Sequence, residues 1–293
     1  MLDKLKVCKR TREIAAKAFL ISFKKLINHK SKISEVNLRN NWLNELRKNK
    51  NIFPDCWYAP PPHGIAVLFS SESSYERTNY QSLRPVKQHP KNNIYLDKQK
   101  GFIYVYASPV DKITGIIGDW GMTIYFGKNK NIIKHLKLCL RFNHQVFNHV
   151  KLNMTFSQLT RFACRSFSQQ ELVNKVVSST DPAGTDIGHT IPASYEDWTP
   201  EEKSIFKKNN WQKILTMIKN KRKFLSEKET LKIRSPMAFT IEQRLINIDN
   251  PDIPLSSFHT IVLIHPDERK ELLTNFDEIF KLTGMDYMLD NNL

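Results

Sequence analysis

Cysteine and long apolar runs are both scarce in this chain, and each absence excludes a class of protein. The 293 residues include four cysteines, Cys8, Cys56, Cys139 and Cys164, with no CxxC pair and no short regular spacing. This pattern excludes a disulfide framework and a zinc knuckle. No stretch reaches the roughly 18 apolar residues of a membrane span, and charged residues interrupt the first thirty positions. We therefore expect a soluble protein in the reducing cytoplasm that does not associate with membranes.

Acidic residues are the minority among the charged ones. The chain has 29 Asp and Glu against 45 Lys and Arg, a formal net charge of +16. Such a charge attracts phosphate, but here the basic residues are spread along the whole chain rather than gathered in one tract. We therefore expect no nucleic-acid partner. With 40% hydrophobic residues and 17 Phe, the chain has enough apolar material for a full core.

The apolar periodicity predicts helices and strands in alternating groups. Helical spacing occurs over 11–29, over a second helix capped by Ser34, and over 131–150, 154–173 and a charged stretch, 200–229. Strand-like runs are 65–69, 102–107, a hairpin return around 119–126, a strand-and-turn segment over 176–192, and 238–241 and 259–264. No low-complexity linker divides the chain. We predict one α+β domain over 1–293, built from two related halves, with the first fifty residues mostly helical.

Four ionisable residues interrupt the strand-like runs, where an unpaired charge is costly to bury. They are Asp119, His189, Glu242 and His259. Taken singly, each has an ordinary structural explanation: a turn cap, a hydrogen-bonded core histidine, an ion pair with Arg244, and a plain strand residue. Taken together on neighbouring strands, two carboxylates and two imidazoles suit a divalent ion such as zinc, iron, cobalt or manganese.

In chain order, the segments around these residues resemble the pita-bread metallopeptidase family, which includes methionine aminopeptidases, Xaa-Pro aminopeptidases and creatinase. The segments are GDWGMTIYFG, GHTIP, PMAFTIEQRL and SFHTIVLI, and PPPHGIAVLF resembles an earlier family segment. The resemblance implies a pseudo-symmetric α+β fold of two halves and a two-metal site of Asp, Asp, His, Glu and Glu. It aligns Asp119, His189, Glu242 and His259 with metal ligands, and His63 with a histidine that contacts substrate.

The departures from the family pattern are concentrated at one of the two metal positions. Eleven residues before Asp119, where the resemblance places the first metal Asp, this chain has Ser108; Asp111 would need a shifted turn to substitute. The last, bridging Glu is His259. A further family histidine, seven residues after His189, is Glu196. The remaining ligands therefore predict a single-metal site rather than a two-metal site.

Three hypotheses follow from this altered site. The first is a hydrolase of small peptides or amide-like molecules that uses one divalent ion, with Glu242 or Glu196 as base and His63 donating to the oxyanion. The second is a mononuclear iron enzyme with oxidative or lyase chemistry on an amino-acid-derived substrate. The third is a metal-free binding module. Because dimers are common in the family, the resemblance also makes a homodimer an expectation.

Overall fold

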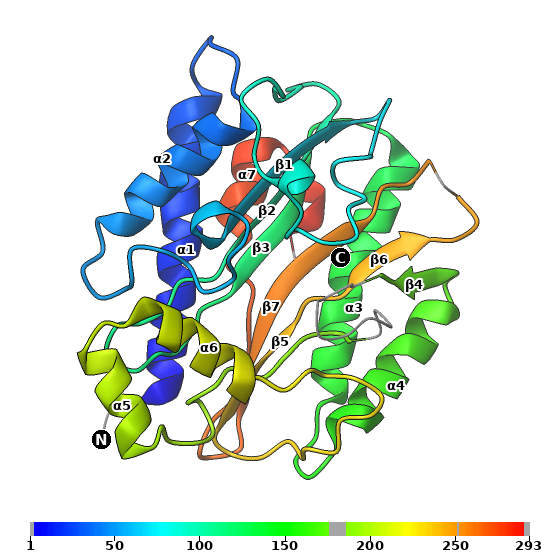
Figure 1. Ribbon diagram of the computed structural model, residues 1–293. Coiled ribbons are helices and arrows are strands. Elements are labelled where there is room, and N and C mark those ends of the chain that lie inside the picture. Colours follow the sequence, from blue (N-terminus) through cyan, green and yellow to red (C-terminus); the bar gives the residue numbers. More distant parts are fainter. Residues whose placement is uncertain (1–2, 176–185, 251, 290–293) are drawn as a thin grey trace.

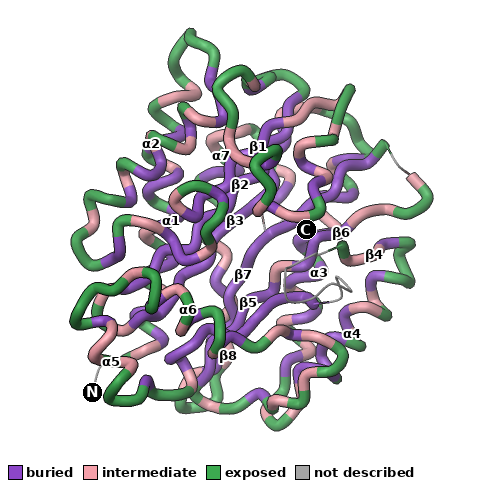
Figure 2. Tube along the Cα trace, viewed as in Figure 1, coloured by how far each residue is buried: buried purple, intermediate pink, exposed green. Residues whose placement is uncertain are grey.

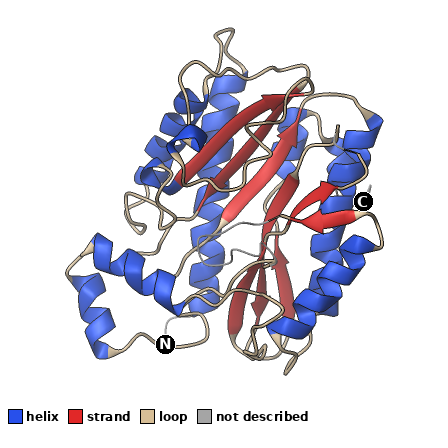
Figure 3. Ribbon diagram, turned by 45° about the vertical axis from the view of Figure 1, so that its right-hand side comes forward, coloured by secondary structure: helices blue, strands red, loops and turns tan. Residues whose placement is uncertain are grey.

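A computed structural model describes residues 3–175, 186–250 and 252–289. Its helices are α1 (Lys4–Ile27), α2 (Glu35–Arg47), α3 (Lys130–His149), α4 (Phe156–Ser168), α5 (Pro200–Lys207), α6 (Trp211–Lys221) and α7 (Asp277–Thr283), with short 3₁₀ turns at Pro62–Gly64, Val86–Gln88 and Asp286–Met288. Its strands are β1 (Ile65–Ser71), β2 (Gly101–Ala107), β3 (Trp120–Tyr125), β4 (Leu172–Asn174), β5 (Met237–Ile241), β6 (Arg244–Asn247), β7 (Ser256–Ile264) and β8 (Lys270–Leu273). The predicted α+β class is confirmed (Figure 3).

The sheet is organised around β7, and all its strand pairs are antiparallel. The order is β1-β2-β3-β7-β6-β4, and β5 and β8 also pair with β7. Figure 1 shows α1, α2 and α7 on the β1–β3 side, and α3 and α4 on the β4–β6 side. Every residue of β7 is buried, and purple follows the strands through the interior in Figure 2. Two groups of strands and helices therefore share one central strand.

Local sequence signals fix the predicted elements at the N-terminal end. The Asp3 side chain accepts hydrogen bonds from the backbone N–H groups of Leu5 and Lys6, so α1 begins at Lys4, earlier than the predicted position 11. Ser34 caps α2 as predicted, accepting from the backbone of Asn37. The hairpin is also confirmed, because β2 pairs with β3.

Other element boundaries were predicted wrongly. The stretch 200–229 contains two short helices separated near Asn210, whose side chain caps α6, and helix ends at Lys221. Helix α4 ends at Ser168, and the last residues of the range 154–173 begin β4. Of the segment 176–192, residues 176–185 lie outside the described residues.

Among the described helices, none combines the length and the apolar character needed to cross a membrane.

A buried histidine on α3 makes stability depend on pH. His135 is 4% exposed, and burial lowers its pKa from 6.5 to about 4. The unfolded chain binds this proton more tightly than the folded protein does. The contribution of His135 to the free energy of unfolding is therefore fully present above pH 6.5, and it is lost as the pH drops from 6.5 towards 4. From pH 7 to pH 4.5 the wild type should lose about 2–3 kcal/mol more than His135→Gln in urea unfolding. His29→Gln, at an exposed histidine, should follow the wild type; equal losses in wild type and His135→Gln would contradict this assignment.

Candidate functional site

Three of the predicted residues meet at the centre of the sheet. Asp119 directly precedes β3, Glu242 directly follows β5, and both strands pair with β7. His189 lies beside β5, where Thr190 bridges Phe239. One ligand atom from each of Asp119, His189 and Glu242 lies within 4.8 Å of the others. Three separate segments therefore converge on one point.

A glycine allows the histidine segment to approach β5. A Cβ atom at Gly188 would lie 2.1 Å from the carbonyl oxygen of Thr240. Without it, the backbone N–H of His189 donates to the Thr240 hydroxyl at 2.9 Å, and the Thr240 N–H donates to the His189 carbonyl at 2.8 Å. The GH pair in GHTIP thus has a packing reason as well as a chemical one.

Asp119 is a buried carboxylate with almost all its acceptor positions in use. Its Oδ1 accepts from the Ser108 hydroxyl and from Trp57 Nε1, and its Oδ2 accepts from the Tyr106 hydroxyl at 3.0 Å. Burial acts to raise the pKa of Asp119, but the hydrogen bond and charge of His189 and the Ser108 hydrogen bond outweigh it and lower the pKa to about 2. Asp119 is therefore ionised at neutral pH.

The tautomer of His189 is set by a backbone carbonyl. Because a carbonyl oxygen only accepts, His189 Nδ1 donates to the Thr190 carbonyl at 3.0 Å. In the neutral ring, Nε2 then presents its lone pair to Asp119 Oδ2, 3.0 Å away. Two electron-rich atoms at this distance need a cation between them, either a proton on Nε2 or a metal ion. A backbone-oriented imidazole is the usual arrangement of a metal-binding histidine, and ligand bonds of about 2.0–2.2 Å suit this spacing. The residues present therefore fit a divalent ion.

The free acceptor positions limit the number of ions. Ser108 and Trp57 occupy both lone pairs of Asp119 Oδ1, and Tyr106 occupies one of Oδ2. One position remains, and it faces His189. Asp111, the sequence alternative to Ser108, instead forms an ion pair with Arg10 at 2.8 Å. This geometry has room for one cation at Asp119.

His259 lies beside Glu242 rather than in the three-residue cluster. Its Nδ1 is 3.0 Å from Glu242 Oε2, and its Nε2 is 3.0 Å from the Tyr104 hydroxyl. Burial acts to raise the pKa of Glu242, but the charges of His189 and His259 outweigh it and lower the pKa. The ion pair between Glu242 and Arg244 that the sequence also allowed does not form; Glu242 pairs with histidines instead.

The structure does not bring His63 and Glu196 to this cluster. The His63 side chain is 39% exposed, and its Nδ1 lies 3.1 Å from Asp55 Oδ1. Glu196 is on the surface, in an ion pair with Arg234 at 3.0 Å. Neither residue lines the pocket above the cluster. The family resemblance identified both segments, but it did not show the directions of the two side chains.

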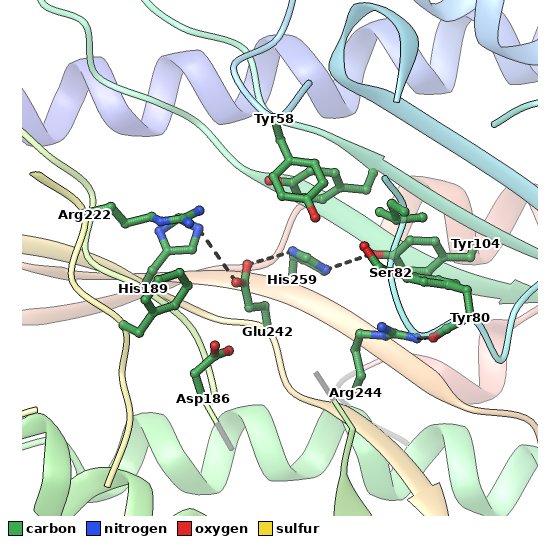
Figure 4. A pocket seen from close by; sticks show the side chains of 13 residues that line it. Tyr58, Tyr80, Ser82, Tyr104, Asp186, His189, Arg222, Glu242, Arg244 and His259 are labelled. Atoms are coloured by element: carbon green, nitrogen blue, oxygen red, sulfur yellow. Dashed lines mark hydrogen bonds and ion pairs between the residues drawn. The ribbon is translucent and has the colours of Figure 1, made fainter. Parts of the chain in front are cut away.

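Sequence reasoning missed most of the pocket lining. Figure 4 shows Tyr58, Tyr80, Tyr104, Arg222 and Arg244 around His189, Glu242 and His259, and Tyr106 also lines the pocket. Alternation on β2 places Tyr104 and Tyr106 on one face, a signal that was available in the sequence. Arg222 is the C-cap of α6, inside the stretch 200–229 that was predicted as helical.

A buried arginine holds the backbone behind the cluster. Arg12 on α1 is fully buried and donates to the carbonyl oxygens of Asp119, His259 and Thr274, the His259 bond being 2.7 Å. It also donates to Asn275 Oδ1 at 3.0 Å. One guanidinium thus fixes the main chain at two residues of the site.

Comparison with solved structures identifies the fold. X-Pro aminopeptidase from Thermotoga maritima matches with a TM-score of 0.58 at 12% identity, over 92% of this chain and 60% of that chain. Prolidase from Pyrococcus furiosus matches with a TM-score of 0.59 at 12% identity, over 94% and 64%. The chain has the pita-bread fold.

A variant of Escherichia coli aminopeptidase P also matches this chain, with a TM-score of 0.59 at 13% identity, over 98% of this chain and 59% of that one. This chain spans about three fifths of the length of the matched structures. No protein-family profile and no curated protein matches its sequence. The fold predicted from the four segments is confirmed. The pita-bread neighbours are peptidases, and the cluster at Asp119, His189 and Glu242 is a candidate metal site within that fold.

Proposed function

We propose that this protein is a metal-dependent hydrolase of small peptides or amide-like molecules, with one divalent ion held by Asp119, His189 and Glu242. The observation that carries the proposal is the 3.0 Å separation of His189 Nε2 and the ionised Asp119 Oδ2 beside a pocket, because a cation must lie between these two atoms. Solved structures with this fold are named as X-Pro aminopeptidase and prolidase, which supports peptide or amide substrates. Nitrogen and carboxylate donors suit zinc, iron, manganese or cobalt.

A bound divalent ion would supply a water of lowered pKa and polarise a carbonyl group. Residues of the chain would accept the proton that this water releases. Glu242 is ionised, so its carboxylate can accept a proton, and the His259 ring, whose Nδ1 lies 3.0 Å from Oε2, keeps that carboxylate in place. The Tyr104 hydroxyl orients the other side of the His259 ring at 3.0 Å. In this proposal Glu242 binds the ion and serves as base, while His259 orients Glu242.

A metal-free binding module is the second candidate, and one observation favours it. If His189 is protonated, Asp119 has a hydrogen-bond donor at every position, from Ser108, Trp57, Tyr106 and His189. Such a carboxylate needs no ion. The two candidates differ in what lies between His189 and Asp119, which metal analysis distinguishes.

The experiment is hydrolysis of a mixed library of dipeptides and N-acyl amino acids, followed by mass spectrometry. Protein treated with chelator should be inactive and should recover on addition of zinc, manganese, cobalt or iron(II). Glu242→Gln should lose activity by about 10³-fold, because it removes a ligand and the base. Glu196→Gln and His63→Ala should retain it, since both side chains lie outside the pocket. Hydrolysis that survives the chelator and Glu242→Gln would refute the proposal.

A further inference from the structure

Two buried guanidinium groups line the pocket and form no ion pair with any carboxylate of the described residues. Arg222 is 8% exposed and Arg244 is 5% exposed. Among the described residues, neither arginine forms an ion pair, and the Nε atom of each has no hydrogen-bond partner. Within the described ranges, the Arg244 guanidinium donates one hydrogen bond, from Nη2 to the Tyr80 carbonyl at 2.5 Å.

Aromatic rings hold both groups in place. The Arg222 guanidinium carbon lies 4.5 Å from the Trp57 ring centre and 4.4 Å from that of Phe224. The Arg244 carbon lies 3.6 Å from the Tyr80 ring centre. Rings fix the orientation of a guanidinium and stabilise it modestly, but they leave its N–H donors free. A buried cation is costly without an anion, so unused donors that face a pocket indicate that the anion belongs to a ligand.

The two arginines lie on opposite sides of the catalytic residues. Figure 4 shows Arg222 on the side of His189 and Arg244 on the side of Tyr80, with Glu242 and His259 between them. Asp119 and Glu242 are paired with His189 and His259, which leaves the guanidinium groups available to attract a ligand from both sides. Planar guanidinium groups match carboxylates in particular, because each pair forms two parallel hydrogen bonds.

We infer that the pocket binds a small dianionic molecule with one carboxylate at Arg222 and the other at Arg244. The substrate class is then an amide with a carboxylate on each side of the bond above Glu242, as in an N-acyl amino acid derived from a dicarboxylic acid. The role of this molecule as a substrate rests on the proposed function. Its binding does not, since both arginines are outside the metal cluster.

Binding of simple dicarboxylates to chelator-treated protein tests the inference without any catalysis. Succinate, glutarate and adipate would each be titrated against the corresponding diamide by calorimetry, because the diamides keep the shape and remove both charges. At least one dicarboxylate should bind 10-fold or more tightly than its diamide. Arg222→Gln and Arg244→Gln should each weaken that dicarboxylate about 10-fold and leave the diamide unchanged.

Arg84→Gln is the matched control, because Arg84 stacks on Tyr58 at 4.7 Å but does not line the pocket. It should bind the dicarboxylates like the wild type, and thermal unfolding checks that all variants fold. Equal binding of dicarboxylates and diamides, or a preference that survives both pocket substitutions, would overturn the inference. Dicarboxylate binding by a protein that hydrolyses no amide would support the inference and count against the proposed function only.

Discussion

His189→Ala is expected to reduce metal-dependent amide hydrolysis on the order of 10³-fold and to remove the bound ion. Among the candidate ligands, His189 alone has a ring oriented by a backbone carbonyl, and its Nε2 is the sole nitrogen of the cluster. Alanine leaves only the two carboxylates, Asp119 and Glu242, and two ligands hold a divalent ion more weakly than three. Activity and metal content should therefore fall together.

His265→Ala is the control for this experiment. His265 directly follows β7, and its Nε2 lies 3.0 Å from Glu271 Oε2, so it is also paired with a carboxylate. It lies outside the cluster and should change neither activity nor metal content. A His189→Ala protein that retains wild-type metal content would contradict the assignment of His189 as a ligand.

Arg12→Met should lower the free energy of unfolding by about 3–5 kcal/mol. Methionine preserves much of the side-chain volume, but it leaves the carbonyl oxygens of Asp119, His259 and Thr274 without their common donor. These carbonyls belong to β7, to the segment before β3 and to the chain after β8, so the loss affects the centre of the sheet.

Urea unfolding measures this effect, and Lys9→Met on the same helix is the control. Lys9 forms a partly exposed ion pair with Glu271 at 2.7 Å, which should contribute less than about 1 kcal/mol. Arg12→Lys should restore only part of the stability, because an ammonium group cannot reach four acceptors as a guanidinium does. An Arg12→Met protein as stable as Lys9→Met would show that the carbonyls find other donors.

The sequence predicted what depends on local pattern. Caps such as Ser34, the strand-like runs of β2 and β7, and the three clustered residues of the site are all visible as short motifs. The resemblance aligned Ser108 with the first metal Asp of the family, and in the structure its hydroxyl donates to Asp119.

The remaining features depend on contacts between distant segments. Arg12 donates to His259, 247 positions away, and no local pattern marks such a pair. Arg222 is the C-cap of α6, and its importance comes from a buried Nε that has no hydrogen-bond partner in the part of the chain that the structure describes. His63 and Glu196 were assigned to the site by motif alone. In the structure their side chains instead contact Asp55 and Arg234 at the surface.

Metal content is the most direct test of the central claim that Asp119, His189 and Glu242 hold one ion. Tag-free protein would be loaded with each candidate metal, desalted and analysed by elemental mass spectrometry, with His189→Ala and His265→Ala in parallel. The account predicts about one equivalent of divalent metal in the wild type and in His265→Ala, and none in His189→Ala. One equivalent of iron without hydrolysis would favour the non-peptidase chemistry instead. No bound metal in the wild type would contradict the account and leave His189 as a protonated partner of Asp119.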